Sequence, residues 1–438
     1  MYSLEDAKII GITGNIGKTS TAYLLHKYLK SIGKKSVLFS SCLVDSPAGY
    51  HVPDETMDFT FSTEEQLVNV LNEALVYEAE FIILECWGES ISNGIFDNIP
   101  FDLKVLTGIS KAYNGHQTPE EELVTKSRFF KDEKDAKCLI DWGWILGPAL
   151  KLLEDCNMSN VVLINSNRDL EFNYNEYYDN CKWITNDTKV KYPSSSIKYS
   201  INSYNGDLRV QELCVKIDNK DINLKTELGG DFHISNILRV IAILNELEIF
   251  DEETFKNFLN NKDFSIPGRF EIIEWQNRII LIDRNKLECL QTVNKLKENN
   301  MIIKLVDGYK ITRSKRNELF RTTHAHFDYS YNFEVSPTNA NKYADFVYIT
   351  TDSIGDMDVN QLMLEYSNRV TIPYLCIPDR KQAIREAILN SKENDVICIV
   401  GRGNESRWYS DYQNLDLFKD RDIVDQVISE IDNKEETI

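Results

Sequence analysis

The chain has 438 residues, which is too long for one ordinary domain, so we expect two or three. Hydrophobic residues make up 42% of it and charged residues 27%, a globular composition that excludes disorder as the main state. With 49 Lys and Arg against 69 Asp and Glu, the formal net charge is −20. We therefore expect no general binding to nucleic acid or to anionic membranes.

The sequence shows no sign of membrane insertion, export or disulfide bonding. No apolar run reaches the roughly 18–20 residues that cross a bilayer, and the charged N-terminus has no signal-peptide pattern. The nine cysteines are scattered and never form Cys-x-x-Cys, which argues against a disulfide framework or a zinc ribbon. We expect a cytoplasmic, reducing environment.

Short apolar runs alternate with amphipathic stretches, a pattern typical of an α/β fold with mainly parallel sheets. In the first part of the chain the predicted strands are Lys8–Thr13, Ser36–Ser40, Phe81–Glu85, Leu103–Ile109 and Val161–Ile164. The predicted helices there are Lys18–Ile32, Thr63–Tyr77 and Pro119–Phe130. Alternating residues around Asn205-Gly206-Asp207 predict a β-hairpin within residues 199–226, and a helix over His233–Leu247 follows.

A break at Asn260–Gly268 precedes a second α/β series, so we place the domains at 1–265 and 266–438. The predicted strands of the second series are Ile279–Asp283, Met301–Val306, Phe346–Thr350, Tyr374–Ile377 and Val396–Val400. Its predicted helices are Lys286–Asn299, one near Arg313–Phe320, Asp358–Ser367 and Arg380–Ser391.

The strongest local signal is a glycine-rich loop between the first predicted strand and helix. It reads Gly11-Ile12-Thr13-Gly14-Asn15-Ile16-Gly17-Lys18-Thr19-Ser20. Glycines let backbone N–H groups curl around phosphate oxygens at a helix N-terminus, where Lys18 would bridge the β- and γ-phosphates and Thr19 would ligate Mg²⁺. The strict phosphate-loop pattern has a glycine where Ile12 stands. The alternative is a strand–helix turn with a chance Gly-Lys-Thr, but the strand and helix context favours a phosphate loop.

The variant spacing of this loop resembles the nucleotide loop of the Mur ligases, G-x-T-G-T-N-G-K-T-S/T, and further resemblances follow in chain order. They involve Ile83–Ser90 (M-E-V-S-S-H), Leu106–Ser110 (F-T-N-L-S), Thr118–Lys126 (T-M-E-x-Y-x-x-A-K), Leu163–Asn167 (I-N-A-D-D), Gly230–Asn236 (G-x-F-N-x-x-N), Pro267–Glu271 (P-G-R-M-E), Asp283–Lys286 (D-Y-A-H) and Asn394–Glu405 (G-D-V-x-L-x-A-G-K-G-H-E). The resemblance implies a Mur-type central P-loop ATPase domain with a mainly parallel sheet, followed by a Rossmann-like C-terminal α/β domain.

The resemblance also implies an activity and its cofactors. ATP, with Mg²⁺, would convert a small-molecule carboxylate into an acyl phosphate, and an amino acid or amine would then displace phosphate to form an amide. The implied catalytic residues are Lys18, Lys126, His116 and Arg269. The implied nucleotide contacts are Gly14, Asn15, Gly17, Lys18, Thr19, Ser20, Asn236, Arg269 and Asp283, the metal ligands Thr19, Glu85 and Lys126, and the substrate contacts Asp352, Arg402 and Glu405.

Individual roles follow from the same resemblance. Glu85 would ligate Mg²⁺, and Lys126 would carry a carbamate that helps to hold a second Mg²⁺. Asn236 would hydrogen-bond adenine, Asp283 would hold the ribose, and Arg269 would reach the phosphates from the domain junction when the domains close. The alternative for each is an ordinary structural role, at a strand end for Glu85 and on the surface for the others, and from the sequence alone Lys126 is a helix-surface lysine.

Several departures from the family pattern limit the assignment of substrate. The family's Asp-His pair is replaced by Ser110-Lys111-Ala112-Tyr113, which puts the second metal in question or transfers its role to His116. Thr351–Gly355 stands where D-N-P-R binds the incoming amino acid; without that arginine we do not expect diaminopimelate as substrate. If Met1 is the true start, we also expect no UDP-binding domain of the family type.

The sequence leaves the roles of two features undecided and allows two other functions. Trp142 and Trp144 lie in the unaligned segment Lys131–Cys156, and they form either a binding surface or core. For His324 and His326 a metal site is the less favoured interpretation. The other functions are an enzyme whose acyl phosphate is captured by ammonia or an internal nucleophile, and a catalytically silent ATP-binding subunit.

Overall fold

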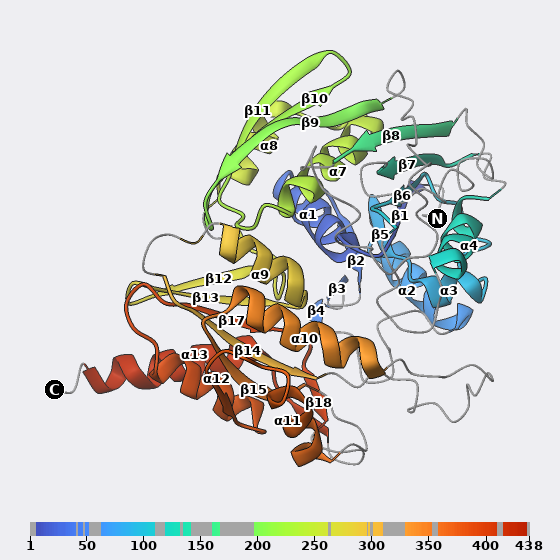
Figure 1. Ribbon diagram of the computed structural model, residues 1–438. Coiled ribbons are helices and arrows are strands. Elements are labelled where there is room, and N and C mark those ends of the chain that lie inside the picture. Colours follow the sequence, from blue (N-terminus) through green and yellow to red (C-terminus); the bar gives the residue numbers. More distant parts are fainter. Residues whose placement is uncertain are drawn as a thin grey trace, which may run out of the picture.

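The computed structural model describes residues 6–40, 43–46, 49–51, 63–109, 119–131, 135–141, 160–166, 197–261, 264–295, 297, 301–309, 329–352, 358–409 and 415–435. Two sheets organise these residues, one built from the first part of the chain and one from the second (Figure 1). The predicted α/β class with mainly parallel sheets is confirmed.

The first sheet has the strand order β11-β10-β9-β8-β7-β6-β1-β5-β2-β3-β4. Its strands are β1 (Lys8–Thr13), β2 (Ser36–Phe39), β3 (Val44–Ser46), β4 (Gly49–His51), β5 (Phe81–Glu85), β6 (Leu103–Leu106), β7 (Lys137–Asp141), β8 (Val161–Asn165), β9 (Ile197–Gly206), β10 (Gln211–Ile217) and β11 (Lys220–Thr226). The strands from β9 to β2 in this order pair in parallel, and β9–β10–β11 and β2–β3–β4 are antiparallel. The predicted hairpin at Asn205–Asp207 is confirmed.

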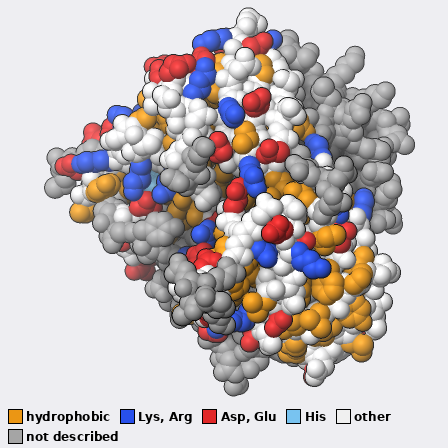
Figure 2. All heavy atoms as spheres, turned by 90° about the vertical axis from the view of Figure 1, so that its left-hand side faces the viewer, with side chains coloured by type: hydrophobic (Ala, Val, Ile, Leu, Met, Phe, Trp, Pro, Cys, Tyr) orange, Lys and Arg blue, Asp and Glu red, His pale blue; other side chains and the backbone are white. Residues whose placement is uncertain are grey.

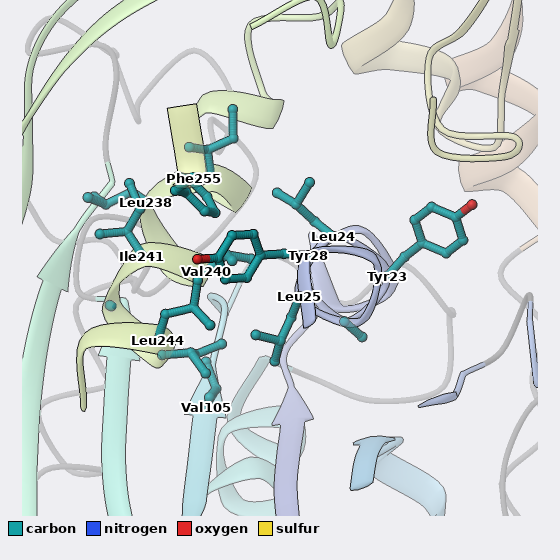
Figure 3. Packing of buried hydrophobic residues seen from close by; sticks show 14 of the residues in the cluster. Tyr23, Leu24, Leu25, Tyr28, Val105, Leu238, Val240, Ile241, Leu244 and Phe255 are labelled. Atoms are coloured by element: carbon teal, nitrogen blue, oxygen red, sulfur yellow. The ribbon is translucent and has the colours of Figure 1, made fainter. Parts of the chain in front are cut away.

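Helices cover both faces of the first sheet. They are α1 (Lys18–Ser31), α2 (Glu64–Val76), α3 (Gly88–Ser92), α4 (Pro119–Phe130), α7 (His233–Glu246) and α8 (Glu252–Leu259). Leu25 and Tyr28 of α1 face Leu244 of α7 over Val105 of β6 in one continuous core (Figure 3). A second core, beneath α2 to α4, fills the opposite face. This packing places the start of α1 at the carboxyl end of β1.

The second sheet has the order β12-β13-β17-β14-β15-β16 and is parallel except at β12. Its strands are β12 (Glu271–Trp275), β13 (Arg278–Asp283), β14 (Ile303–Tyr309), β15 (Phe346–Thr351), β16 (Tyr374–Cys376) and β17 (Val396–Val400), with the ribbon β18 (Arg407–Tyr409) and β19 (Leu415–Leu417) beside it. The helices are α9 (Lys286–Lys295), α10 (Tyr329–Tyr343), α11 (Val359–Ser367), α12 (Arg380–Leu389) and α13 (Asp420–Glu435).

Several elements depart from the sequence-based expectations. The strand β7 lies inside the segment that matched no pattern, and α8, β12 and α10 were not predicted either. The strand predicted at Met301–Val306 runs instead over Ile303–Tyr309, and the helix predicted near Arg313–Phe320 lies outside the described residues. The boundary predicted at residue 265 falls between α8 and β12.

Acidic and basic side chains are interspersed on the face drawn in Figure 2. Among the described residues, no helix is long and apolar enough to cross a membrane.

Candidate active site

The glycine-rich loop lies between β1 and α1 and is held by its neighbours. Asn15 N–H donates to the carbonyl of Gly108 (3.0 Å), and the Thr107 hydroxyl donates to the carbonyl of Ile16 (2.5 Å). Lys18 Nζ donates back to the carbonyl of Gly14 (2.7 Å). The loop is therefore folded around its own lysine, with the N-terminus of α1 directly behind it.

Position 17 of the loop accommodates only glycine. Its φ is +83°, and a Cβ there would lie 2.4 Å from Arg239 Nη1 and 2.7 Å from Asn236 Oδ1. The left-handed backbone and the close polar neighbours both exclude larger residues. The loop thus rests directly on two side chains of α7.

Arg239 is a supporting residue that the sequence motifs did not reveal. It is 3% exposed, its Nε lies 2.6 Å from Asp141 Oδ2, and its Nη1 donates to Asn236 Oδ1 (2.9 Å). Asp141 also accepts a hydrogen bond from the Ser166 hydroxyl. A buried charge of this kind is tolerated only when it is paired and hydrogen-bonded. The pair ties β7 and α7 together below the loop, and no local motif signals it because its members lie 98 positions apart.

Thr19 and Glu85 converge where Mg²⁺ was predicted. The Thr19 hydroxyl lies 3.1 Å from both carboxylate oxygens of Glu85, and the two residues are 9% and 3% exposed. Both offer oxygen ligands, which Mg²⁺ prefers in company with phosphate oxygens and water. The donor set therefore fits the predicted ion, although the described part of the chain has no group of three or more His, Cys, Asp or Glu residues that could hold a metal ion by themselves.

Lys126 reaches the same region from α4. It is 2% exposed, and its Nζ lies 3.3 Å from the position that a Cβ of Gly88 would occupy. Gly88 follows Glu85 by three residues, so the lysine lies next to the strand end that carries the carboxylate. Its carbamylation stays a prediction. His116 lies outside the described residues, as do Trp142, Trp144, His324 and His326.

Arg269 connects the two sheets at the loop. Its Nη2 lies 3.5 Å from the Thr19 hydroxyl, and its carbonyl accepts a hydrogen bond from His233 Nε2 (3.0 Å). A Cβ on the preceding Gly268 (φ +64°) would lie 2.1 Å from the Asn404 nitrogen, so this linker needs glycine to pack against the loop after β17. The guanidinium is thereby held beside the phosphate loop from the domain junction.

Two further predicted nucleotide contacts are buried. Asn236 donates to His233 Nδ1 (3.1 Å) and accepts from Thr21 as well as from Arg239, so its amide supports the loop; its contact with adenine stays a prediction. Burial raises the pKa of Asp283 to about 7, although the charge of Arg269 acts against the shift. Asp283 Oδ2 has no hydrogen-bond partner among the described residues, which suits an acceptor for a ribose hydroxyl.

The predicted substrate contacts lie at the carboxyl edge of the second sheet. Arg402 is fully buried. Its Nη1 lies 3.3 Å from Asp420 Oδ1, and its Nη2 donates hydrogen bonds to the carbonyls of Glu405 and Phe418. Asp352, 3.9 Å from Arg402 Nε, accepts no hydrogen bond from a described residue. Glu405 Oε1 lies 3.1 Å from Arg284. These roles stay predictions.

Fold and loop together define an α/β protein with a phosphate loop in its first sheet and a Rossmann-like second sheet. Residues 12–143 match the Mur ligase middle domain. Over 97% of its length the chain is 26% identical to the UDP-N-acetylmuramoyl-L-alanyl-D-glutamate–2,6-diaminopimelate ligase of Prochlorococcus marinus, covering 77% of that protein. The chain is therefore a relative of the Mur ligases, and the resemblance inferred from its motifs is confirmed.

Solved structures agree on the fold. A UDP-N-acetylmuramoyl-L-alanyl-D-glutamate–2,6-diaminopimelate ligase superposes with a TM-score of 0.59 at 18% identity, over 97% of this chain and 78% of that one. The MurF ligase of Thermotoga maritima, solved with ADP, gives a TM-score of 0.59 at 14% identity over 98% of this chain and 81% of that one.

Proposed function

We propose that this chain is an ATP- and Mg²⁺-dependent ligase that joins a small-molecule carboxylate to an amino acid or amine. The observation that carries the proposal is the meeting of Lys18, Thr19, Glu85 and Arg269 at one end of β1 and β5. A phosphate loop, an acidic metal ligand and an arginine from the domain linker are the groups that phosphoryl transfer requires. The relatives' names, which describe amide-forming ligases, support the same reaction class.

Each residue of the site has a separate role in the proposed reaction. Backbone N–H groups of the loop and Lys18 bind the β- and γ-phosphates, and Arg269 stabilises negative charge on the phosphoryl group in transfer. Thr19 and Glu85 would hold Mg²⁺, which neutralises phosphate charge when bound. Asp283, at the end of β13, would hold the ribose. Lys126, as a carbamate, would add a second carboxylate-like ligand beside Gly88.

The reaction balances in two steps. A carboxylate oxygen attacks the γ-phosphorus, ADP leaves, and an acyl phosphate forms. The amine then attacks the acyl carbon, the C–O bond breaks, the amine loses a proton, and inorganic phosphate departs with the oxygen that came from the carboxylate. This route predicts that one ¹⁸O atom moves from a labelled carboxylate into phosphate.

Phosphate release with a panel of carboxylates and amines tests the proposal. Release should require one member of each class and ATP, and mass spectrometry of the phosphate should show the ¹⁸O transfer with the productive pair. The folded Lys18→Ala variant should release none. Tight ATP binding without release for any pair would instead indicate a silent ATP-binding subunit, and normal turnover in Lys18→Ala would remove the phosphate-loop assignment.

A further inference from the structure

Trp87 is a side chain at the candidate active site to which no role has yet been assigned. It follows β5 with an extended backbone (φ −85°, ψ 153°) and precedes α3. Side chains two positions apart in an extended segment lie on the same side, so Trp87 shares the side of Glu85. Cys86, between them, is fully buried in the core on the other side. The backbone thus directs the indole toward the phosphate loop.

The indole ring contacts the lysine of that loop. Lys18 Nζ lies 4.9 Å from the ring centroid of Trp87, within the range of a cation–π interaction. This ammonium is the group that bridges the β- and γ-phosphates in phosphate loops. Trp87 is therefore adjacent to the place where the terminal phosphoryl group of a bound nucleotide would lie.

The indole N–H is buried and has no acceptor in the part of the chain that the structure describes. Nε1 exposes less than 1 Å² and forms no hydrogen bond with any described residue. An indole N–H only donates, and a buried one normally has a partner, because leaving it unpaired costs free energy. A bound ligand could therefore supply the acceptor that this donor lacks.

The neighbours of this donor identify the acceptor's chemistry. Lys18 makes the immediate surroundings cationic, and Glu85 and Thr19 lie on the same side of the strand end. An anionic phosphoryl oxygen satisfies both the indole donor and the ammonium, whereas adenine and ribose bind at the other end of the nucleotide. The resemblance to the family segment M-E-V-S-S-H puts Trp87 at a position where that segment has a serine.

We infer that Trp87 donates its indole N–H to an oxygen of the γ-phosphoryl group of ATP, as a second donor beside Lys18. The inference rests on the proposed function, because it needs ATP in the phosphate loop. Trp87 would then hold the phosphoryl group in the direction of attack.

Nucleotide affinities test this role with defined probes, ADP and ADP with beryllium fluoride, which occupies the γ-phosphoryl position. Trp87→Phe keeps an aromatic ring for Lys18 but removes the N–H. Its affinity for ADP–beryllium fluoride should fall about tenfold, and its affinity for ADP by less than about twofold, because a hydrogen bond to a charged group is lost in only the first complex. Trp275→Phe, whose indole bonds to Asp432 (2.9 Å) in the second sheet's domain, should change neither affinity.

Equal affinities in Trp87→Phe and the wild type, or an equal loss for both probes, would overturn the inference. An independent measurement uses the intact protein, which has six tryptophans. The indole ¹H–¹⁵N signal that is missing from Trp87→Phe should shift in the wild type with ADP–beryllium fluoride and not with ADP; an unshifted signal would contradict us.

Lys18→Ala distinguishes a failure of the proposed function from a failure of the role of Trp87. If this variant binds ADP–beryllium fluoride as well as the wild type does, the proposed function fails and the role of Trp87 fails with it. If Lys18→Ala is impaired while Trp87→Phe is not, the proposed function stands and only the role of Trp87 is overturned.

Discussion

Arg269 Nη2 lies 3.5 Å from the Thr19 hydroxyl, although 250 positions separate the two residues in the chain. The contact places a cation from the domain linker beside the phosphate loop and makes the site depend on both sheets. Gly268 packs against the loop at Asn404 with no space for a side chain, and Arg269 Nη1 donates a hydrogen bond to the Gly268 carbonyl (3.0 Å).

Arg269→Ala should lower ATP turnover about 10²–10³-fold, since it removes one charged donor to the transferring phosphoryl group. The measurement is phosphate release with the productive carboxylate and amine. Arg385→Ala, which loses a half-exposed pair with Glu430, is the matched control and should keep full turnover. Unchanged turnover in Arg269→Ala would mean that this arginine only links the domains.

Glu85→Gln should raise the Mg²⁺ concentration needed for half-maximal ATP binding by about tenfold or more, because it replaces a charged oxygen ligand with a neutral amide. Titration of Mg²⁺ at fixed ATP measures this shift, and chelation of Mg²⁺ should abolish the tight ATP complex in the wild type. The exposed Glu89 provides the control Glu89→Gln. If both variants follow the wild-type curve, Glu85 is no metal ligand.

Asp283 should make the protein less stable as the pH rises from about 4 to about 7. Its pKa is raised from 3.8 to about 7 in the folded state by burial, so across this range the folded state binds the proton more tightly than the unfolded state does. Above about pH 7 the buried carboxylate is charged, and its full cost is present.

Asp283→Asn should therefore raise the melting temperature at pH 8 by a few degrees, roughly 2–4 °C per kcal/mol, and should leave it almost unchanged near pH 4. Thermal unfolding at the two pH values measures the difference, and the half-exposed Asp97 provides the control Asp97→Asn. An equal change at both pH values would show that the charge of Asp283 carries no such cost.

Arg239→Met should destabilise the protein by about 3–5 kcal/mol, because it leaves Asp141 buried without its cationic partner. Urea unfolding measures this loss. Arg128, which pairs with Asp97 on the surface, is the control, and Arg128→Ala should cost no more than about 1 kcal/mol. A small effect of Arg239→Met would mean that the loop does not depend on this pair.

We expect Lys126 to react reversibly with carbon dioxide and form a carbamate. The carbamate would replace this buried cation with an anionic oxygen ligand. With ¹³C-labelled bicarbonate, the wild type should give a carbamate ¹³C signal that disappears in Lys126→Ala. The exposed Lys8 provides the control Lys8→Ala, which should keep the signal. The same signal in Lys126→Ala would assign it to another amine.

The fold class could be predicted from sequence because its signals are local. Short apolar runs mark β1 and β5, and the loop Gly14–Ser20 carries its chemistry within a few residues. The strand β7 escaped prediction because its five residues form no recognisable pattern alone; pairing with β6 and β8 stabilises it. The polar helix α10, which contains Pro337, likewise depends on packing against α9 and β14.

The sequence by itself determined the α/β class, the glycine-rich loop and the resemblance to the Mur ligases, since these depend on short motifs that follow one another in the chain. Only the tertiary structure decided that Arg239 supports Gly17, that Arg269 reaches Thr19, and that the N–H of Trp87 is buried beside Lys18 without an acceptor among the described residues. Each of these relationships joins side chains from different elements. The burial of such groups and the distances between them are set when the sheets and helices pack. Neither can therefore be predicted from a short stretch of sequence.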